Sequence, residues 1–384
     1  MKKCVIITAR DPIKYYGGDI NRLNTLIQQY SKHFKVTVII TGYYKKALLE
    51  DVMLGSVKVQ VIYVSNSLLR KCAGIIWALF RDKPLQVGIF ANPYVQRQVS
   101  TMLKAKAYDL CIFHLFRTFI PSSTLLTPKV HLDLCDVQSK AYGKQKKVSG
   151  TRIFRRWLYR YEYIRTKRIE KNLANAEDVS ISLISQEDTN HYLKSYNVKN
   201  KIWSLPNNFN LTHMDDMTKK RNKVAIVGNF YAAHNQLLVD QAIKHKIARD
   251  PNLQLFVIGQ MTQTYEGKIN KSGVKAVRNP LNIVDHLSDS EYGLCFLEYS
   301  AGFQTKLIDY ANAGLVPIVS ENVARGAELI DLNSCLVIKK LNELPKCFEL
   351  NASDKQGIVR NFRLSLNELK IYGEKSWSKH IMEI

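Results

Sequence analysis

The stretch from Gly293 to Ser320, GLCFLEYSAGFQTKLIDYANAGLVPIVS, is the feature that most constrains the fold. Its pattern predicts a buried strand at Leu294–Leu297, a loop of small residues and a helix from Lys306 to Ala313. Gly314 then ends the helix, and Leu315–Val319 returns as a second strand. A strand, a helix and a strand in this order form the repeating unit of an α/β protein.

Two charged residues mark the start of this predicted helix. Lys306 and Asp309 lie three residues apart and therefore share one face. Amides at a helix start and a nearby lysine suit a diphosphate, and a carboxylate one turn later suits ribose hydroxyls. The segment predicts a nucleotide-sugar pocket; an ordinary βα helix with a surface Lys–Asp pair is the alternative.

The same residues resemble the donor-binding motif of GT-B glycosyltransferases of the GT4 type, Gly-x-x-x-Lys-x-x-Glu-Ala-x-Ala-x-Gly-x-Pro. Asp309 stands where the family usually has Glu, and Ala301 replaces its common first Glu. The loop is similar to that of bacterial envelope and exopolysaccharide sugar transferases. The resemblance implies an α/β fold with two Rossmann-like domains facing across a cleft. It also implies donor contacts from Gly302, Phe303, Gln304, Thr305, Lys306 and Asp309.

The length of 384 residues allows two domains, each with its own core. The polar, turn-rich segment Pro206–Lys223 predicts the boundary between them. Residues 1–205 are then an acceptor-side Rossmann-like domain, and residues 206–365 a nucleotide-sugar-binding one. By the same resemblance, a C-terminal helix at 366–384 completes the first domain.

Several candidate residues of the first domain adjoin predicted strands. Gly17 and Gly18 precede a helix, where a ligand can approach the backbone closely, although a tight turn explains them equally well. His114 follows a buried strand, at the sheet edge where ligands bind, but a lone histidine is often structural. In the family, a histidine here contacts the transferred sugar, and Asp136 resembles an acceptor-side residue.

The first strand of the second domain leads into Gly228 and Asn229. GT4 enzymes often have a basic pair in this region for the donor phosphates. Its absence here places more of the phosphate charge on Lys306. By the same resemblance, Arg278 is expected near the base of the nucleotide.

The chain is strongly basic, with 56 Lys+Arg against 33 Asp+Glu and a net charge of +23, which favours a polyanionic partner. Residues 140–171 hold 12 Lys+Arg interleaved with aromatic residues. This pattern fits an anionic membrane surface, a solvated helix with its aromatics in the core, or nucleic acid. We favour the membrane and expect no nucleic acid. The residues expected at the membrane or acceptor are Arg152, Arg155, Arg156, Trp157 and Arg160.

A second helix is predicted at Leu68–Arg81, with an apolar face rimmed by basic residues. The pattern fits a helix of the core or one that rests on a membrane surface. We predict a core helix. Its apolar face comprises Leu68, Leu69, Ile75, Ile76, Leu79 and Phe80.

The cysteines and the acidic residues bear on the cellular compartment and on the use of a metal. The seven cysteines are scattered and form no Cys-x-x-Cys pair, which indicates reduced thiols in a cytosolic protein. No signal peptide and no apolar stretch of membrane-spanning length is recognised. The chain lacks the Asp-x-Asp pair with which GT-A transferases hold a metal. We therefore expect no catalytic metal and no cofactor.

These features together predict a glycosyltransferase of the hexosyltransferase type, retaining by resemblance. The donor is a nucleoside diphosphate sugar, and the acceptor a bacterial surface polysaccharide or lipid-linked glycan. Asp309 would hold the ribose, Lys306 the diphosphate, His114 the sugar and Asp136 the acceptor. The protein is expected in the cytoplasm, at the inner face of the plasma membrane. A nucleotide-sugar epimerase and a nonenzymatic membrane- or nucleic-acid-binding protein are the alternatives.

Overall fold

Short apolar runs alternate with helices along the chain, and each run becomes a strand of one of two sheets. The structure is a computed structural model. It describes residues 2–13, 18–42, 48–54, 56–120, 129–145, 153–176, 178–212, 223–244, 253–297, 303–329 and 333–384. The chain divides into unit 1, residues 1–208 and 373–384, and unit 2, residues 209–372.

Unit 1 contains an eight-stranded sheet in the order β3-β4-β2-β1-β5-β6-β7-β8, parallel except for the edge strand β3. Its elements are β1 (Lys2–Thr8), α1 (Gly18–Ser31), β2 (Phe34–Ile40), β3 (Leu48–Leu54), β4 (Val57–Tyr63), α2 (Leu68–Phe80), α3 (Leu85–Phe90), α4 (Pro93–Ala105), β5 (Leu110–His114), η1 (Phe116–Thr118), β6 (Val130–Cys135), α5 (Gln138–Gln145), α6 (Ile153–Ala174), β7 (Val179–Leu183), α7 (Gln186–Ser195) and β8 (Ile202–Ser204).

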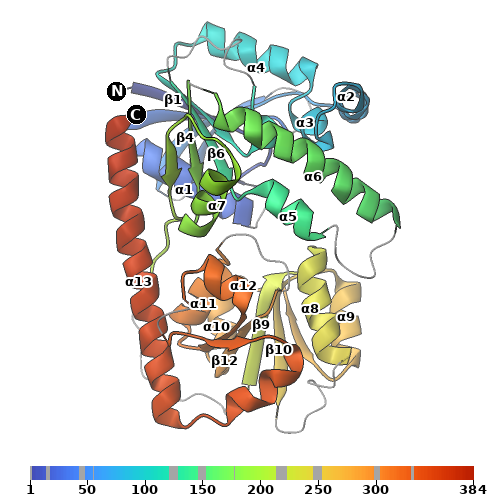
Figure 1. The fold of residues 1–384 in the computed structure, drawn as a ribbon, viewed down its shortest axis with the longest axis vertical. Helices are drawn as coiled ribbons and strands as arrows, with labels where there is room; N and C mark the ends of the chain where they lie inside the picture. Colours follow the sequence, from blue (N-terminus) through green and yellow to red (C-terminus); the bar gives the residue numbers. More distant parts are fainter. Residues whose placement is uncertain are drawn as a thin grey trace. The chain divides into compact units, whose positions relative to one another are not determined.

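Alternate residues of the strands face two separate cores. Val5 and Ile7 of β1 join the core beneath α3, α4, α6 and α7, whereas Cys4 and Ile6 join the core beneath α1 and the end of α13. Helices therefore cover both faces of the sheet, as its continuous apolar strands require (Figure 1).

Unit 2 has a six-stranded parallel sheet in the order β11-β10-β9-β12-β13-β14. Its elements are β9 (Lys223–Asn229), α8 (Ala233–Lys244), β10 (Gln254–Gln260), α9 (Gln263–Lys271), β11 (Lys275–Arg278), α10 (Ile283–Leu287), β12 (Tyr292–Cys295), α11 (Lys306–Asn312), β13 (Val316–Ser320), α12 (Glu321–Gly326), β14 (Leu336–Ile338) and η4 (Leu341–Phe348). Helices α8 and α9 lie on one face, and α10, α11 and α12 on the other (Figure 1). The last helix, α13 (Ala352–Glu383), begins in unit 2 and ends in unit 1.

The predicted α/β class with two Rossmann-like domains is confirmed. The predicted boundaries lay at 205/206 and 365/366, and the observed division lies at 208/209 and 372/373. That the two domains face each other across a cleft stays a prediction. Among the described residues, no helix combines the length and hydrophobicity needed to cross a membrane.

The prediction that Leu68–Arg81 is a core helix is wrong. Only Gly74 and Ala78 of α2 are buried, and Ile75 and Trp77 are half-buried. The other large apolar residues of the helix are exposed: Leu68, Leu69, Ile76, Leu79 and Phe80. The physical reason lies in the neighbouring helix. A Cβ added at Gly74 would lie 2.0 Å from the carbonyl oxygen of Gly88 in α3, so only the small-residue side of α2 fits inward.

Candidate functional site

The strand order of unit 2 reverses between β9 and β12, and ligands of open parallel sheets bind at such a switch point. Four of the predicted donor residues lie at this place. Gly228 and Asn229 end β9, and Lys306 opens α11 after β12, with Asp309 one turn further on. The predicted strand, helix and strand at 294–319 are observed as β12, α11 and β13. Gly314 ends α11 in the left-handed region, with φ of 62°.

Lys306 is a buried cation, with 8% of the residue exposed. Its Nζ donates to Oδ1 of Asn235 at 3.1 Å, and Nδ2 of Asn235 donates to the carbonyl oxygen of Asn229 at 2.9 Å. Among the residues that the structure describes, no carboxylate lies within 4.0 Å of Nζ. A buried charge is ordinarily compensated by an opposite charge. The arrangement therefore leaves room for an anionic ligand at Lys306.

Asp309 shares this site. Burial raises the pKa of its carboxyl to about 6, although the charge of Lys306 acts in the opposite direction. The group is therefore largely ionised at pH 7 and loses its charge just below pH 6. An ionised carboxylate accepts hydrogen bonds and can bind hydroxyl groups of a ligand.

The loop before α11 supplies three further predicted donor residues, Phe303, Gln304 and Thr305. Phe303 stacks on Phe209, with ring centroids 6.2 Å apart and planes inclined by 11°. The carbonyl oxygens of Gln304 and Thr305 accept the amides of Leu307 and Ile308, each at 3.0 Å, and so begin the helix.

Three predicted residues, Gly17, Arg152 and Gly302, lie outside the described part of the chain. Arg278 is described but engaged elsewhere. Its Nε donates to Oε2 of Glu266 at 2.8 Å, at the end of the edge strand β11. No contact in the described structure joins Arg278 to the group around Lys306.

Unit 1 has its own switch point, between β1 and β5. His114 ends β5 and is fully buried, with Nδ1 lying 3.1 Å from Oγ1 of Thr8 in β1. Its Nε2 has no hydrogen-bond partner among the described atoms. Burial lowers the pKa of His114 to about 4, so that the ring is neutral at pH 7. The next residue, Leu115, has a φ of 72°, a strained value for a leucine.

Gly18 begins α1 after the first strand, and Asp19 follows it. Asp19 accepts from Nε of Arg10 at 3.1 Å and from Nη2 of Arg117 at 3.4 Å. Each of these two arginines thus has an anionic partner within the chain, although they share one carboxylate.

The sequence reasoning missed a buried ion pair next to His114. Arg22 of α1 and Asp133 of β6 are both fully buried, with Nη2 and Oδ1 2.6 Å apart. Nη1 of Arg22 also donates to the carbonyl oxygen of Leu205 at 2.6 Å, and Ser182 donates to Asp133 at 2.7 Å. Burial alone would raise the pKa of Asp133, but Arg22 holds it well below its ordinary value. The sequence did contain a signal for this pair, because Arg22 and Asp133 each interrupt an otherwise apolar pattern.

Asp136 lies just after β6 and is half-buried. Burial, together with the charges of Asp188 and Asp133, raises the pKa of its carboxyl to about 8. At pH 7 the group is therefore mainly protonated and can donate a hydrogen bond. Perturbed carboxyl groups at the end of a parallel strand are frequent at functional sites.

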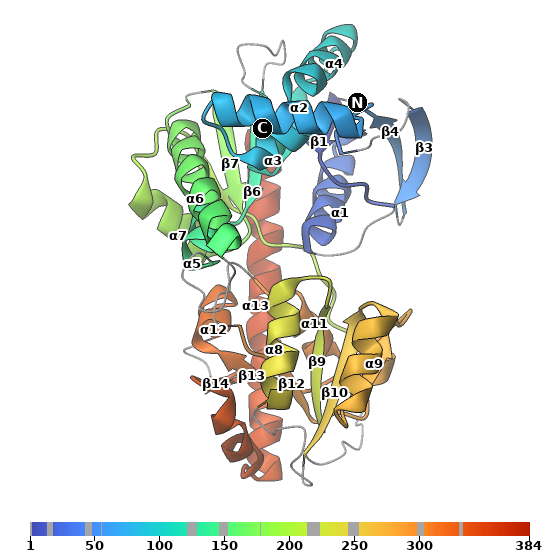
Figure 2. The same ribbon diagram turned by 90° about the vertical axis from the view of Figure 1, so that its right-hand side faces the viewer.

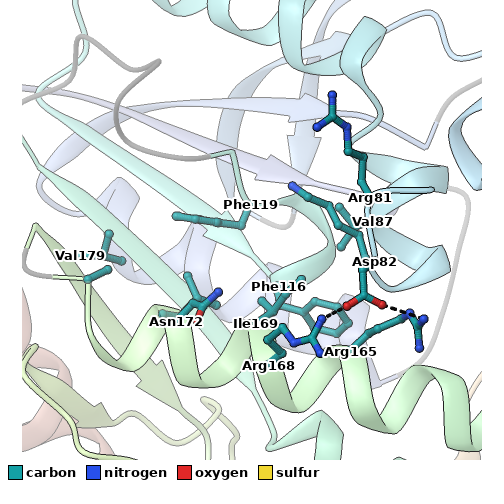
Figure 3. A pocket seen from close by; sticks show the side chains of 13 residues that line it. Arg81, Asp82, Val87, Phe116, Phe119, Arg165, Arg168, Ile169, Asn172 and Val179 are labelled. Atoms are coloured by element: carbon teal, nitrogen blue, oxygen red, sulfur yellow. Dashed lines mark ion pairs between the residues drawn. The ribbon is translucent and has the colours of Figure 1, made fainter. Parts of the chain in front are cut away.

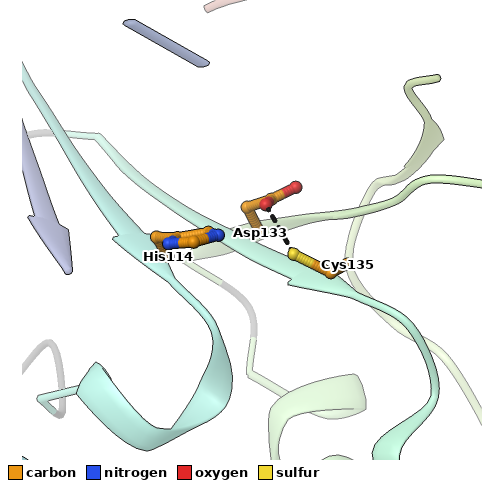
Figure 4. A group of neighbouring side chains, drawn as sticks. All are labelled: His114, Asp133 and Cys135. Atoms are coloured by element: carbon orange, nitrogen blue, oxygen red, sulfur yellow. Dashed lines mark hydrogen bonds between the residues drawn. The ribbon is translucent and has the colours of Figure 1, made fainter. Parts of the chain in front are cut away.

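His114, Asp133 and Cys135 have ligand atoms within 4.8 Å of one another, close enough to consider a metal ion (Figure 4). The donor set fits a cation poorly. Asp133 is committed to the Arg22 guanidinium, whose charge would repel the ion, and burial raises the pKa of the Cys135 thiol. The prediction that no metal takes part stays a prediction.

The basic residues predicted at a membrane lie on the first turns of α6. Arg155, Arg156, Trp157 and Arg160 are all exposed. Trp157 stacks on Phe154 at a centroid distance of 6.3 Å, whereas Tyr161 is buried. This part of α6 thus presents both cations and aromatic rings to the solvent.

No protein-family model and no curated protein sequence matches this chain. Solved structures share its fold. The α,α-trehalose 6-phosphate synthase from Burkholderia multivorans is 11% identical, with a TM-score of 0.63 over 100% of this chain and 98% of that one. WaaG, a glycosyltransferase involved in lipopolysaccharide biosynthesis, is 14% identical, with a TM-score of 0.62 over 98% of each chain. Anabaena HepE, solved in complex with UDP, is 13% identical, with a TM-score of 0.60 over 99% of this chain and 98% of that one. The fold is therefore that of the GT-B glycosyltransferases.

Proposed function

We propose that this protein is a glycosyltransferase that uses a nucleoside diphosphate sugar. The observation that carries the proposal is the buried Lys306, whose only hydrogen-bond partner among the described residues is the neutral side chain of Asn235. A diphosphate would supply the missing negative charge, and Asp309 one turn away would accept ribose hydroxyls. The similar structure of HepE supports the choice of ligand, since it was solved in complex with UDP.

In the proposed reaction, the bond between the anomeric carbon and the diphosphate oxygen breaks, and a bond to an acceptor hydroxyl oxygen forms. The hydroxyl proton is lost, and the nucleoside diphosphate leaves. Lys306 would stabilise the charge that develops on the leaving diphosphate. His114 is proposed to position the sugar and Asp136 the acceptor. Transfer of a hexose with retention, following GT4 enzymes, belongs to the proposal.

We further propose that the acceptor is a bacterial surface polysaccharide or a lipid-linked glycan, reached from the cytoplasmic face of the membrane. The exposed cations and aromatic rings at the start of α6 support a peripheral contact with anionic lipid. The relation of WaaG to lipopolysaccharide biosynthesis is consistent with such an acceptor.

The test is a thermal-shift screen against UDP, GDP, ADP and CMP. One of these nucleotides should raise the melting temperature of the wild-type protein, and Lys306→Ala should lose that shift. Lys268→Ala, an exposed lysine of unit 2, serves as the control. The cognate nucleotide sugar should then be consumed only with an acceptor, and a chelator should not slow transfer. Full donor binding by Lys306→Ala would overturn the proposal, and consumption without acceptor would favour an epimerase.

A further inference from the structure

The outer face of α2 exposes large apolar side chains to solvent. We define this α2 face by Leu68, Leu69, Ile76, Leu79 and Phe80. Leu69 is 82% and Phe80 85% exposed, values at which neither side chain contributes to the core. The helix contains no acidic residue. An apolar stripe of this length on a surface helix is a mark of an interaction site.

The packing of α3 against the opposite side of α2 fixes the orientation of α2. Gly74 approaches Gly88 of α3 so closely that a Cβ on either glycine would lie within 2.2 Å of the carbonyl oxygen of the other. Figure 2 shows α2 along the outside of unit 1 with α3 packed beside it. Rotating the apolar residues inward would bring bulky side chains into this contact. The exposure of the α2 face is therefore built into the packing.

A basic pocket begins where the α2 face ends. Directly after Phe80, the chain turns through Asp82, which has a φ of 52°, and Arg81 and Lys83 line a cavity of about 380 Å³. Arg165 and Arg168 of α6 line it as well (Figure 3). Arg165 pairs with Asp82 at 2.7 Å, and Arg168 pairs with the same carboxylate. Asp82 thus pairs with two of the four cations that line the cavity, whose inner wall is largely apolar.

Two hydrogen bonds connect the segment that follows α2 to α6. The Tyr161 hydroxyl donates to the carbonyl oxygen of Lys83 at 3.1 Å, and the amide of Leu85 donates to Glu162 at 2.8 Å. Burial and the nearby charge of Arg81 lower the pKa of Lys83. Four cations and one carboxylate therefore line the same cavity, which leaves it with a net positive charge. An anion would compensate this charge.

We propose that the α2 face and the adjoining basic pocket dock on an anionic lipid bilayer. The apolar side chains enter the boundary between headgroups and acyl chains, and the pocket receives a lipid phosphate. Charge complementarity selects this occupant over a second copy, because two chains of net charge +23 would bring two basic rims together. This inference deepens the proposed function, since it rests on a membrane-bound acceptor, and it assigns the main contact to α2 rather than to α6.

The test is sedimentation of the full chain with vesicles of phosphatidylcholine, alone or mixed with phosphatidylglycerol. The wild type should bind the mixed vesicles, and Leu69→Ser/Phe80→Ser should weaken binding on the order of a hundredfold, since each side chain contributes about tenfold. The matched control is Leu281→Ser/Met382→Ser, which removes two exposed apolar side chains elsewhere and should bind normally.

A second pair of variants tests the pocket. Arg81→Gln/Lys83→Gln should reduce binding to the mixed vesicles by about fivefold for each cation removed. Lys268→Gln/Lys275→Gln, which removes two cations of unit 2, should not. Undiminished binding by Leu69→Ser/Phe80→Ser would overturn the proposal. So would a wild-type dimer that ignores vesicles and that this variant dissociates, because a second copy would then be the occupant.

The nucleotide screen separates this inference from the proposed function. Leu69→Ser/Phe80→Ser changes only exposed residues, so it should keep the wild-type melting temperature and the nucleotide-induced shift. If the wild type binds vesicles through the α2 face but no nucleotide, the glycosyltransferase proposal fails and the docking surface stands. If nucleotides bind and vesicles do not, the docking surface fails.

Discussion

The two sheets have equivalent switch points, but their charges are balanced in different ways. In unit 1, Arg22 and Asp133 form a fully buried pair, and Arg10 and Arg117 both pair with Asp19. In unit 2, the buried Lys306 has the amide of Asn235 as its only hydrogen-bond partner among the described residues, and it forms no ion pair there with Asp309, which lies one turn away. A site whose charges match one another is stable without a ligand. A site whose cation has no ion-pair partner is stabilised when an anion binds, and for this reason we propose the diphosphate in unit 2.

The largest effect should come from breaking the matched pair of unit 1. Arg22→Met leaves the Asp133 carboxylate buried without its cation, which should destabilise the protein by about 3 to 5 kcal/mol. The matched control, Arg22→Met/Asp133→Leu, removes both charges and should recover most of that loss. Thermal unfolding without nucleotide measures both. An unchanged melting temperature in Arg22→Met would contradict the view that the pair maintains unit 1.

The corresponding change in unit 2 should have the opposite sign. Lys306→Met removes a buried charge that has no ion pair among the described residues, so the nucleotide-free protein should gain stability on the order of 1 kcal/mol. The same unfolding measurement applies, with Lys268→Met as the control at an exposed position. A loss of stability comparable to that of Arg22→Met would mean that Lys306 has an anionic partner within the chain.

A pH-dependent effect concerns Asp309. Its pKa of about 6 lies above the ordinary 3.8, so the folded protein is destabilised by ionisation and gains stability as the pH falls through 6. Asp309→Asn should therefore stabilise the nucleotide-free protein above pH 6 and leave it nearly unchanged below pH 4.

Donor binding should depend on Asp309 in the reverse direction. The affinity of the wild type for a nucleotide sugar should fall as the pH drops below about 6, because the proposed ribose contact needs the carboxylate. Asp309→Asn should bind about tenfold more weakly at pH 7 and show no such fall. Calorimetry at several pH values measures this. A pH profile identical in wild type and variant would remove Asp309 from the donor site.

Much of the fold could be predicted because it follows from local patterns. Apolar runs separated by helices of the right length predict parallel α/β sheets, and the strand, helix and strand around Lys306 are observed nearly as expected. Gly314 ends α11 because its conformation favours glycine. These features depend on residues close together in the sequence.

The errors arose where distant residues meet. The apolar residues of α2 do not predict which side of the helix packs inward. That side is set by the close approach of Gly74 to Gly88. The partner of Arg22 lies 111 positions away in β6, and that of Lys306 lies 71 positions away in α8. The spacing of apolar residues along a helix or a strand does not show which distant residues come into contact.

The sequence alone therefore determined the class of fold, the order of its elements and the candidate Lys306 and Asp309, because spacing along a helix or strand sets which side chains share a face. Only the tertiary structure decided how each charge is compensated and which apolar face is left in solvent. Both depend on the elements that pack together, and the free energy of a buried charge or an exposed leucine is set by those neighbours.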